Sequence, residues 1–229
     1  MSTSREAIQH QRLCSNDVSR FTANEFAAQK KTFYSSERDS ETVKLRRRNW
    51  SAEIQPGLNK RRLWFLDETG MNLSLAKEYA RSQKGIRAVG NKPKNYGDSV
   101  TLLGAINEDG TIAALEVRGS TDEIVILTFI KEVLSFYLSP GDCVVLDNLS
   151  SHKTLKVQEA FAVLGVEVCY LPPYSPDLNP IEMCWSKIKT FLKQVAARNY
   201  SSLSEAISKA LKTITAADAK NWIRHCGYV

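Results

Sequence analysis

Long hydrophobic runs are missing from this 229-residue sequence, and so is the apolar stretch of a secretory signal. A helix that crosses a bilayer needs roughly 20 consecutive apolar residues, and no run here approaches that length. The first residues, MSTSREAIQHQ, are polar and carry no apolar segment after their charges. We therefore expect a cytoplasmic protein with no membrane partner.

Paired cysteines are lacking as well. The cysteines are odd in number, widely spaced and without a CxxC pair: Cys14, Cys143, Cys169, Cys184 and Cys226. This pattern argues against a disulfide framework and against a thiolate zinc site, so we expect reduced thiols. The chain is 43% hydrophobic and 24% charged, which is typical of a soluble globular protein and excludes a disordered one.

The sequence has no strong excess of charge of one sign, because its formal net charge is only +6. The excess is uneven, because residues 1–60 hold 11 basic and 7 acidic side chains, whereas residues 61–229 hold 20 and 18. A mild basic excess permits a nucleic-acid partner without indicating one, since an ordinary slightly basic protein has the same balance.

The first part of the chain, residues 1–60, is predicted to be a basic helical N-terminal extension. Residues 39–54 have helical spacing, with Val43, Arg47, Trp50 and Ile54 on one stripe. The pair Pro56-Gly57 is expected to break this helix. A solvated surface helix packed through Trp50 is the simplest interpretation of the segment.

Residues 61–229 are predicted to form one α/β domain in which a mixed sheet is flanked by helices. The first three strands are expected to form a meander, and the later two alternate with helices. The helix at 121–138 is expected to have Ile126, Ile130, Val133 and Tyr137 on one face. The expected strands are 61–67, 99–106, 111–117, 143–147 and 166–171, and the expected helices are 121–138, 152–164, 180–197, 202–214 and 215–225.

Two buried strands end in the same way, because Leu63–Leu66 runs into Asp67 and Val144–Leu146 runs into Asp147. A carboxylate at the end of an apolar strand is costly unless it is paired, hydrogen-bonded or bound to a metal. Strand-end caps are the ordinary explanation for either residue alone. Their joint occurrence favours a functional site, because sites form at the carboxyl ends of central strands.

A third acid would complete such a site, and three residues are candidates. Glu68 follows the first aspartate and would point to the opposite face of the sheet. Asp177 lies in the loop PPYSPDLNP, where four prolines in nine residues prevent regular structure. Glu182 lies just inside a helix, but with Asn179 as N-cap and Pro180 at the first helical position it would equally suit a capping box.

The helix that carries Glu182 has a buried stripe, consisting of Ile181, Trp185, Ile188, Leu192 and Val195. Beside this stripe the helix carries Lys187, Lys189 and Lys193. These lysines could bind phosphate, although a solvated lysine face is equally consistent with the pattern. Three carboxylates would suit Mg²⁺ or Mn²⁺, which prefer oxygen ligands. Two such ions about 4 Å apart can activate a nucleophile and stabilise the leaving oxygen of a phosphodiester.

Three ordered blocks, WFLDETG, VVLDNLSSHK and LPPYSPDLNPIEMCWSKIK, resemble the signature blocks of DDE transposases, most closely the mariner-related bacterial insertion-sequence branch. The 34 residues between Asp147 and Glu182 match the spacing of that branch. The segment RSQKGIRAVG…SVTLLGAINEDG between the first two acids is also similar. The resemblance covers about residues 28–225.

This resemblance implies a ribonuclease H-like fold in which Asp67, Asp147 and Glu182 form the catalytic, metal-binding triad. It implies two Mg²⁺ or Mn²⁺ ions, cleavage of DNA at transposon ends, and attack of the freed 3′-hydroxyl on target DNA without a covalent protein–DNA intermediate. Asn148 and His152, in the second block, could orient a carboxylate, the scissile phosphate or a water, or could serve only the hydrogen bonding of their loop.

A Gly-containing stretch after the first strand carries a cluster of basic residues: Arg81, Lys84, Arg87, Lys92 and Lys94. These residues could bind along a DNA backbone, or the stretch could be a solvated loop. Tyr174 and the prolines around it are expected to form a rigid shelf for the helix of Glu182.

Relatives of full length carry helix-turn-helix modules before the catalytic domain, and residues 1–60 lack a complete paired module. We therefore expect the catalytic half of a transposase, associated with the nucleoid, working with a separate helix-turn-helix subunit or a full-length transposase. Family analogy suggests a homodimer on paired transposon ends. Two alternatives stay open: a remnant that binds DNA or a transposase without cutting, and a ribonuclease H-type or resolvase-like nuclease that shares only the fold.

Overall fold

The computed structural model describes residues 34–94 and 99–228. Residues 1–33 of the predicted N-terminal extension, Cys14 among them, lie outside the described residues. The chain divides into the units Met1–Tyr34 and Ser35–Val229, and the description below concerns the second. Within the described ranges, no helix combines the length and the apolar character that a membrane span requires.

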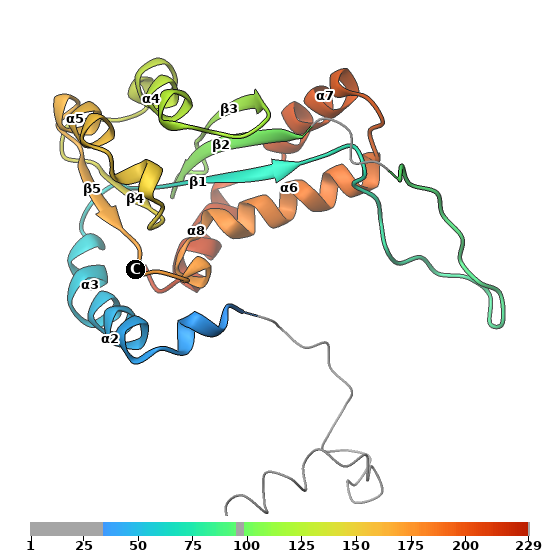
Figure 1. Ribbon diagram of the computed structural model, residues 1–229, viewed down its shortest axis with the longest axis horizontal. Helices are drawn as coiled ribbons and strands as arrows, with labels where there is room; N and C mark the ends of the chain where they lie inside the picture. The colour runs from blue at the N-terminus through green and yellow to red at the C-terminus, as the bar shows by residue number, and fades with distance from the viewer. Residues whose placement is uncertain (1–33, 95–98, 229) are drawn as a thin grey trace, which may run out of the picture. The chain divides into compact units, whose positions relative to one another are not determined.

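The sheet is mixed and has the strand order β3-β2-β1-β4-β5 (Figure 1). Pairing is antiparallel between β1, β2 and β3, which confirms the predicted meander, and parallel between β1, β4 and β5. The strands are β1 Leu63–Met71, β2 Val100–Asn107, β3 Ile112–Arg118, β4 Cys143–Leu146 and β5 Glu167–Tyr170.

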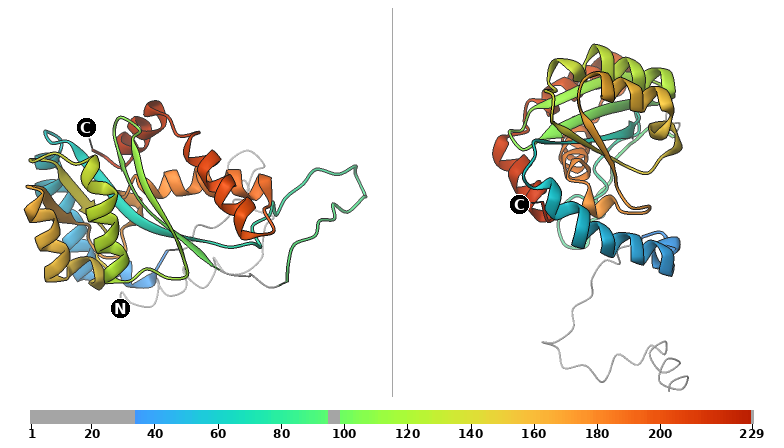
Figure 2. Two further views of the ribbon diagram at one scale, coloured as in Figure 1. Left: turned by 90° about the horizontal axis from the view of Figure 1, so that it is seen from above. Right: turned by 90° about the vertical axis from the view of Figure 1, so that its left-hand side faces the viewer.

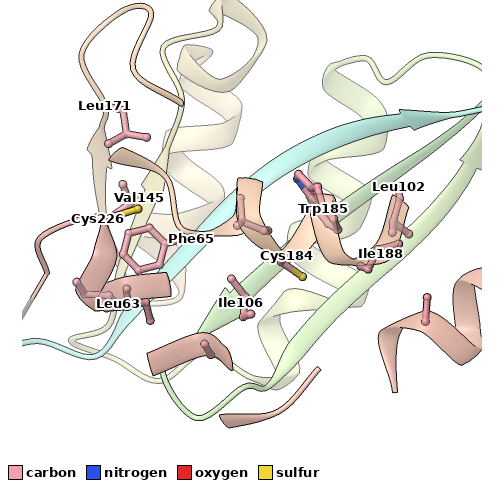
Figure 3. Packing of buried hydrophobic residues seen from close by; sticks show 14 of the residues in the cluster. Leu63, Phe65, Leu102, Ile106, Val145, Leu171, Cys184, Trp185, Ile188 and Cys226 are labelled. Carbon is pink, nitrogen blue, oxygen red and sulfur yellow. The ribbon is translucent and has the colours of Figure 1, made fainter. Parts of the chain in front are cut away.

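Helices cover both faces of the sheet, because alternate residues of the buried central strands point to opposite sides. Trp64 and Val144 pack with α4 (Glu123–Glu132) and α5 (Leu155–Val163). Phe65 and Val145 pack on the other face, in a second core with the C-terminal helices (Figure 3). Those helices are α6 (Ile181–Val195), α7 (Tyr200–Leu211) and α8 (Ala216–His225), drawn in orange and red in Figure 2.

The helix before the sheet does not end at Pro56, so the predicted break is wrong. It runs from α2 (Glu41–Asn49) through a π-helical turn, Trp50–Ile54, into α3 (Gln55–Leu58). The N–H of Gln55 bonds to the carbonyl of Trp50, five residues back, and Pro56 then sits in the first turn of α3, where a missing N–H costs little. The wider π turn also takes Ile54 off the predicted stripe, leaving it 44% exposed.

The helix predicted for 121–138 is shorter than expected. α4 ends at Glu132 and is followed by a 3₁₀ turn, Leu134–Phe136, which turns Tyr137 outward and leaves it 40% exposed. In the same way, the predicted 152–164 helix begins only at Leu155, after a 3₁₀ turn at Ser150–Lys153. Val195, at the end of the α6 stripe, is 47% exposed, because the left-handed residue Ala196 ends the helix there.

Candidate active site

The parallel ladder between β1 and β4 ends at the pair Leu66 and Leu146, and Asp67 and Asp147 are the next residues on each strand. β1 itself continues four residues beyond Asp67, because β2 still pairs with it there. Asp67 is therefore at the end of the parallel pairing and in the middle of its own strand. The prediction that two acids emerge side by side depends only on the parallel register, and the structure has that register.

Both aspartates line one cavity of about 440 Å³, and Glu182 from α6 lines it as well. The remaining wall comes from Asn148 and Leu149 and from the proline-rich loop that follows β5, which contributes Leu171 to Pro176 and then Asn179. Three carboxylates therefore reach the same cavity from three separate elements: β1, the end of β4, and the first turn of α6.

Asp67 is only 9% exposed, and its carboxylate accepts a hydrogen bond from Nε1 of Trp185 at 3.1 Å. Burial raises its pKa to about 7, and the negative charges of Glu182 and Asp147 add to the rise. The indole fits because the residue opposite Asp67 on β2 is Gly104, where a Cβ atom would lie 2.7 Å from the Trp185 ring. A glycine on the central sheet thus makes room for the group that orients Asp67.

Glu182 is an exposed residue in the first turn of α6, yet the protein around its carboxyl group partly desolvates that group and raises its pKa. Nearby Lys189 opposes the rise and Asp147 adds to it. The capping-box alternative is wrong, because no side chain caps this helix. Asn179 is 3% exposed and in extended conformation, and within the described residues its Oδ1 has no hydrogen-bond partner. Glu182 is thus left available to the cavity, and Asn179 becomes a buried polar wall residue.

Glu68 points to the opposite face of the sheet, as predicted. Its Oε1 accepts a hydrogen bond from Thr121 Oγ1 at 3.2 Å and lies 3.2 Å from Nε2 of His152. His152 is fully buried, and its Nδ1 lies 2.7 Å from Oδ1 of Asp147, in a contact too poorly aligned to count as a hydrogen bond. The imidazole therefore bridges Glu68 and Asp147: a carboxylate contact for His152 was one of the roles considered from the sequence, whereas Glu68 as its second partner was not.

Burial alone would lower the pKa of His152, but the carboxylates of Asp147 and Glu68 outweigh it and raise the pKa to about 9. The ring is accordingly a cation at neutral pH. It contacts the carboxylate of Asp147 without lining the cavity itself. Asn148 lies beside Asp147 in the cavity wall, and its Oδ1 accepts a hydrogen bond from Lys153. The only sequence signal for this arrangement was the short spacing of these residues after β4.

Asp177 does not reach the cavity. Its carboxylate is bound by Arg47, at 2.6 Å from Nη2, and by Arg38 at 3.0 Å, both from the basic helical segment before the sheet. Of the three acids considered as the third member, Glu182 is therefore the one that lines the cavity with Asp67 and Asp147. Tyr174 lies in the wall, 48% exposed, with a left-handed φ of 55° that is unusual for a bulky residue.

The predicted DNA-contacting residues are divided between two places. Arg81, Lys84, Arg87, Lys92 and Lys94 are exposed on the long connection between β1 and β2, which extends beyond the sheet (Figure 1) and outside the cavity wall. On α6, Lys187 is paired with Asp218 at 2.6 Å, which partly neutralises it. Lys189 and Lys193 are half-buried, and Lys189 is close enough to Glu182 to influence its pKa.

The donor set fits a hard divalent cation, because carboxylate oxygens are the ligands that Mg²⁺ and Mn²⁺ prefer. The carboxylate of Asp67 is buried, its side-chain partner is the neutral indole of Trp185, and its charged neighbours Glu182 and Asp147 are negative, so its pKa is raised. Across residues 34–94 and 99–228, no three His, Cys, Asp or Glu side chains lie close enough together to hold an ion as they stand. Binding would therefore have to draw the three carboxylates together.

The sheet has the order β3-β2-β1-β4-β5 and carries two of the three cavity acids at its centre, and the family comparison identifies the class of protein to which it belongs. The model of the DDE superfamily endonucleases matches residues 62–206, more than half of the chain, so the chain belongs to this family. The predicted resemblance to DDE transposases is thereby confirmed. No curated protein sequence matches the chain significantly.

Among solved structures, the chain is similar to the Mos1 transposase paired-end complex with left transposon end, with a TM-score of 0.72 and 16% identity over 96% of this chain and 67% of that chain. It is also similar to the catalytic domain of Mos1 mariner transposase, with a TM-score of 0.57 and 15% identity over 87% and 91%. At such identities the likeness shows the fold, and it confirms the ribonuclease H-like architecture. The chain spans about two thirds of the longer Mos1 chain.

Proposed function

We propose that the chain is the catalytic domain of a transposase, which cleaves DNA phosphodiesters at transposon ends and joins the freed 3′-hydroxyl to target DNA. The observation that carries this proposal is the convergence of Asp67, Asp147 and Glu182 on one cavity from three elements. Support also comes from Mos1 transposase, whose solved paired-end complexes include one with Mg and one with Mn.

Asp67, Asp147 and Glu182 would hold the metal ions, which we expect to be two Mg²⁺ or Mn²⁺ ions. Such ions would supply Lewis-acid activation of an attacking oxygen and charge stabilisation of a departing one. The protein supplies the orientation of its ligands: Trp185 binds the carboxylate of Asp67, and His152 contacts that of Asp147. Asn148 and the proline-rich loop complete a wall that would position the scissile phosphate.

DNA would be bound mainly through its phosphates. The exposed basic residues between β1 and β2, together with Lys189 and Lys193 on α6, are the proposed contacts, and they would give salt-sensitive, sequence-independent affinity. Lys187 contributes less, because Asp218 already pairs with it. End recognition would come from a helix-turn-helix subunit or a full-length transposase, and the working form would be a homodimer on paired ends, associated with the nucleoid. The proposed boundary between the N-terminal extension and the catalytic domain lies after residue 60.

The test is a nicking assay on duplex DNA that carries the transposon ends, with Mg²⁺ or Mn²⁺ and with or without the DNA-recognition subunit. Metal-dependent nicking by the wild type and its loss in Asp67→Asn are the expected results. Glu159→Gln, which removes an exposed carboxylate from α5, is the matched control and should nick normally. If the wild type binds DNA but never nicks it, the non-catalytic alternative replaces this proposal.

A further inference from the structure

Arg47 on the basic helix α2 binds side chains of the proline-rich loop that forms part of the cavity wall. Arg47 donates through Nη1 to Oδ1 of Asp177 at 3.0 Å and through Nη2 to Oδ2 at 2.6 Å, which is a bidentate pair. The same Nη1 donates to Oγ of Ser175 at 2.6 Å. The Arg47 side chain is only 19% exposed, so these contacts are partly shielded from solvent. Arg38 adds a second contact to Asp177.

The residues that Arg47 binds belong to the loop that leads into Glu182. Ser175 Oγ donates onward to the carbonyl of Pro173, next to the strained Tyr174 in the cavity wall. On the other side, a chain of turn hydrogen bonds runs toward α6, from Leu178 N–H to Ser175 O and from Asn179 N–H to Pro176 O. The N–H of Glu182 then bonds to the carbonyl of Asn179.

Side chains supply several of the hydrogen bonds that fix this loop, because four prolines remove backbone donors from residues 172–180. Tyr228 donates to the carbonyl of Leu178 at 2.9 Å and supports the end nearest α6. Arg47 supports the end nearest the cavity wall, where a non-glycine residue is held in the left-handed region at an energetic cost.

We propose that Arg47 is a positioning residue, through which helix α2 sets the conformation of the proline-rich loop and thereby the placement of Glu182 in the cavity. Because α2 belongs to the segment that precedes the catalytic sheet, this contact would couple events on that segment to the active site. The catalytic part of this inference rests on the proposed function, whereas the loop part does not.

The first measurement is amide hydrogen exchange on Arg47→Ala, which needs no activity. Exchange at Leu178 and Asn179 should accelerate by at least about tenfold, while Val144 and Val145 in β4 should exchange as in the wild type. Arg48→Ala removes an equal charge from an exposed position on the same helix and should leave the loop unchanged. Unchanged loop exchange in Arg47→Ala, or acceleration throughout the sheet, would overturn the proposal.

The second measurement is the single-turnover nicking rate at saturating DNA. Arg47→Ala should be at least about tenfold slower than Arg48→Ala, a difference of about 1.4 kcal/mol in the barrier. Arg47→Lys keeps the charge but not the bidentate geometry, so we expect partial recovery. The double variant with Asp177→Ala should lose less than the product of the two single losses, because the two residues share a bidentate contact.

The outcomes separate the two claims. A loosened loop with a rate equal to that of Arg48→Ala would refute the link to Glu182 while leaving the proposed function intact. If the wild type does not nick DNA at all, the proposed function fails, and hydrogen exchange alone decides whether Arg47 holds the loop.

Discussion

Two neighbouring acids on β1 have opposite surroundings. Asp67 and Glu68 are both largely buried, with 9% of the Asp67 residue and 12% of the Glu68 side chain exposed. Glu68 faces the cationic ring of His152, whereas Asp67 faces Glu182 and Asp147, and in the described part of the chain no cation pairs with it. The protein neutralises one carboxylate itself and leaves the other with a raised pKa. A buried carboxylate without a cation partner, such as Asp67, is suited to bind a metal ion. A carboxylate already paired with a cation, such as Glu68, is suited to hold a neighbouring side chain in place.

The largest effect should separate these two acids by activity. Asp67→Asn removes a proposed ion ligand, so we expect the nicking rate to fall by roughly 10³-fold or more, which is about 4 kcal/mol in the barrier. Glu68→Gln leaves the cavity carboxylates in place and should cost roughly tenfold at most. Rates from single-turnover assays at saturating Mg²⁺ provide the comparison. Equal losses in the two variants would break it.

The second effect concerns stability in the absence of divalent ions. Because the pKa of Asp67 is raised to about 7 from 3.8, the folded protein keeps a proton that the unfolded chain releases, and stability falls as pH rises from 4 through 7. The total loss is on the order of 4 kcal/mol at pH 8. In Asp67→Asn this loss should disappear, making the variant more stable than the wild type at pH 8 but not at pH 4. Urea unfolding in EDTA measures it, and parallel pH profiles would contradict it.

The third effect has the opposite sign, because His152 is stabilised as a cation. Its pKa is raised from 6.5 to about 9, so its contribution is fully present below pH 6.5 and is lost as pH rises through 9. His152→Gln should lower the free energy of unfolding by roughly 2–3 kcal/mol at pH 7 and by much less at pH 10. Denaturant unfolding at the two pH values tests this. A cost that does not change with pH would show that His152 acts through packing alone.

The smallest effect is expected far from the cavity. Replacing Lys84 and Arg87 together by Gln should weaken DNA binding several-fold and reduce the slope of log K against log salt by about 2, if each contacts one phosphate. The rate at saturating DNA should not change, because neither residue lines the cavity. Fluorescence anisotropy at several salt concentrations measures the slope. An unchanged slope would assign these residues to a solvated loop.

Features that depend on residues close together in the sequence could be predicted, whereas features that depend on contacts between distant segments could not. Two apolar strands that run into acids were visible locally, and parallel pairing then sufficed to bring Asp67 and Asp147 together. Glu182 was not decided locally, because an acid near a helix start equally suits a capping box, and only the packing of α6 on β1 settled it. Once the family pattern was recognised, the 34-residue spacing singled it out.

Other features depended on contacts between distant segments. Arg47 and Asp177 are 130 residues apart, so nothing near either position predicted their pairing. The bridge from Glu68 through His152 to Asp147 joins opposite faces of one sheet, which a strand pattern does not encode. The helix that continues through Pro56 needed a π turn, and the standard 3.6-residue period does not anticipate one.

The most direct test of this account is Mn²⁺ binding at pH 8, measured by electron paramagnetic resonance with duplex DNA present and absent, on the wild type, Asp67→Asn and Glu68→Gln. The account predicts binding to the wild type and to Glu68→Gln, and at least about tenfold weaker binding to Asp67→Asn. Equal binding by the wild type and Asp67→Asn, or no binding by the wild type with DNA present, would contradict it.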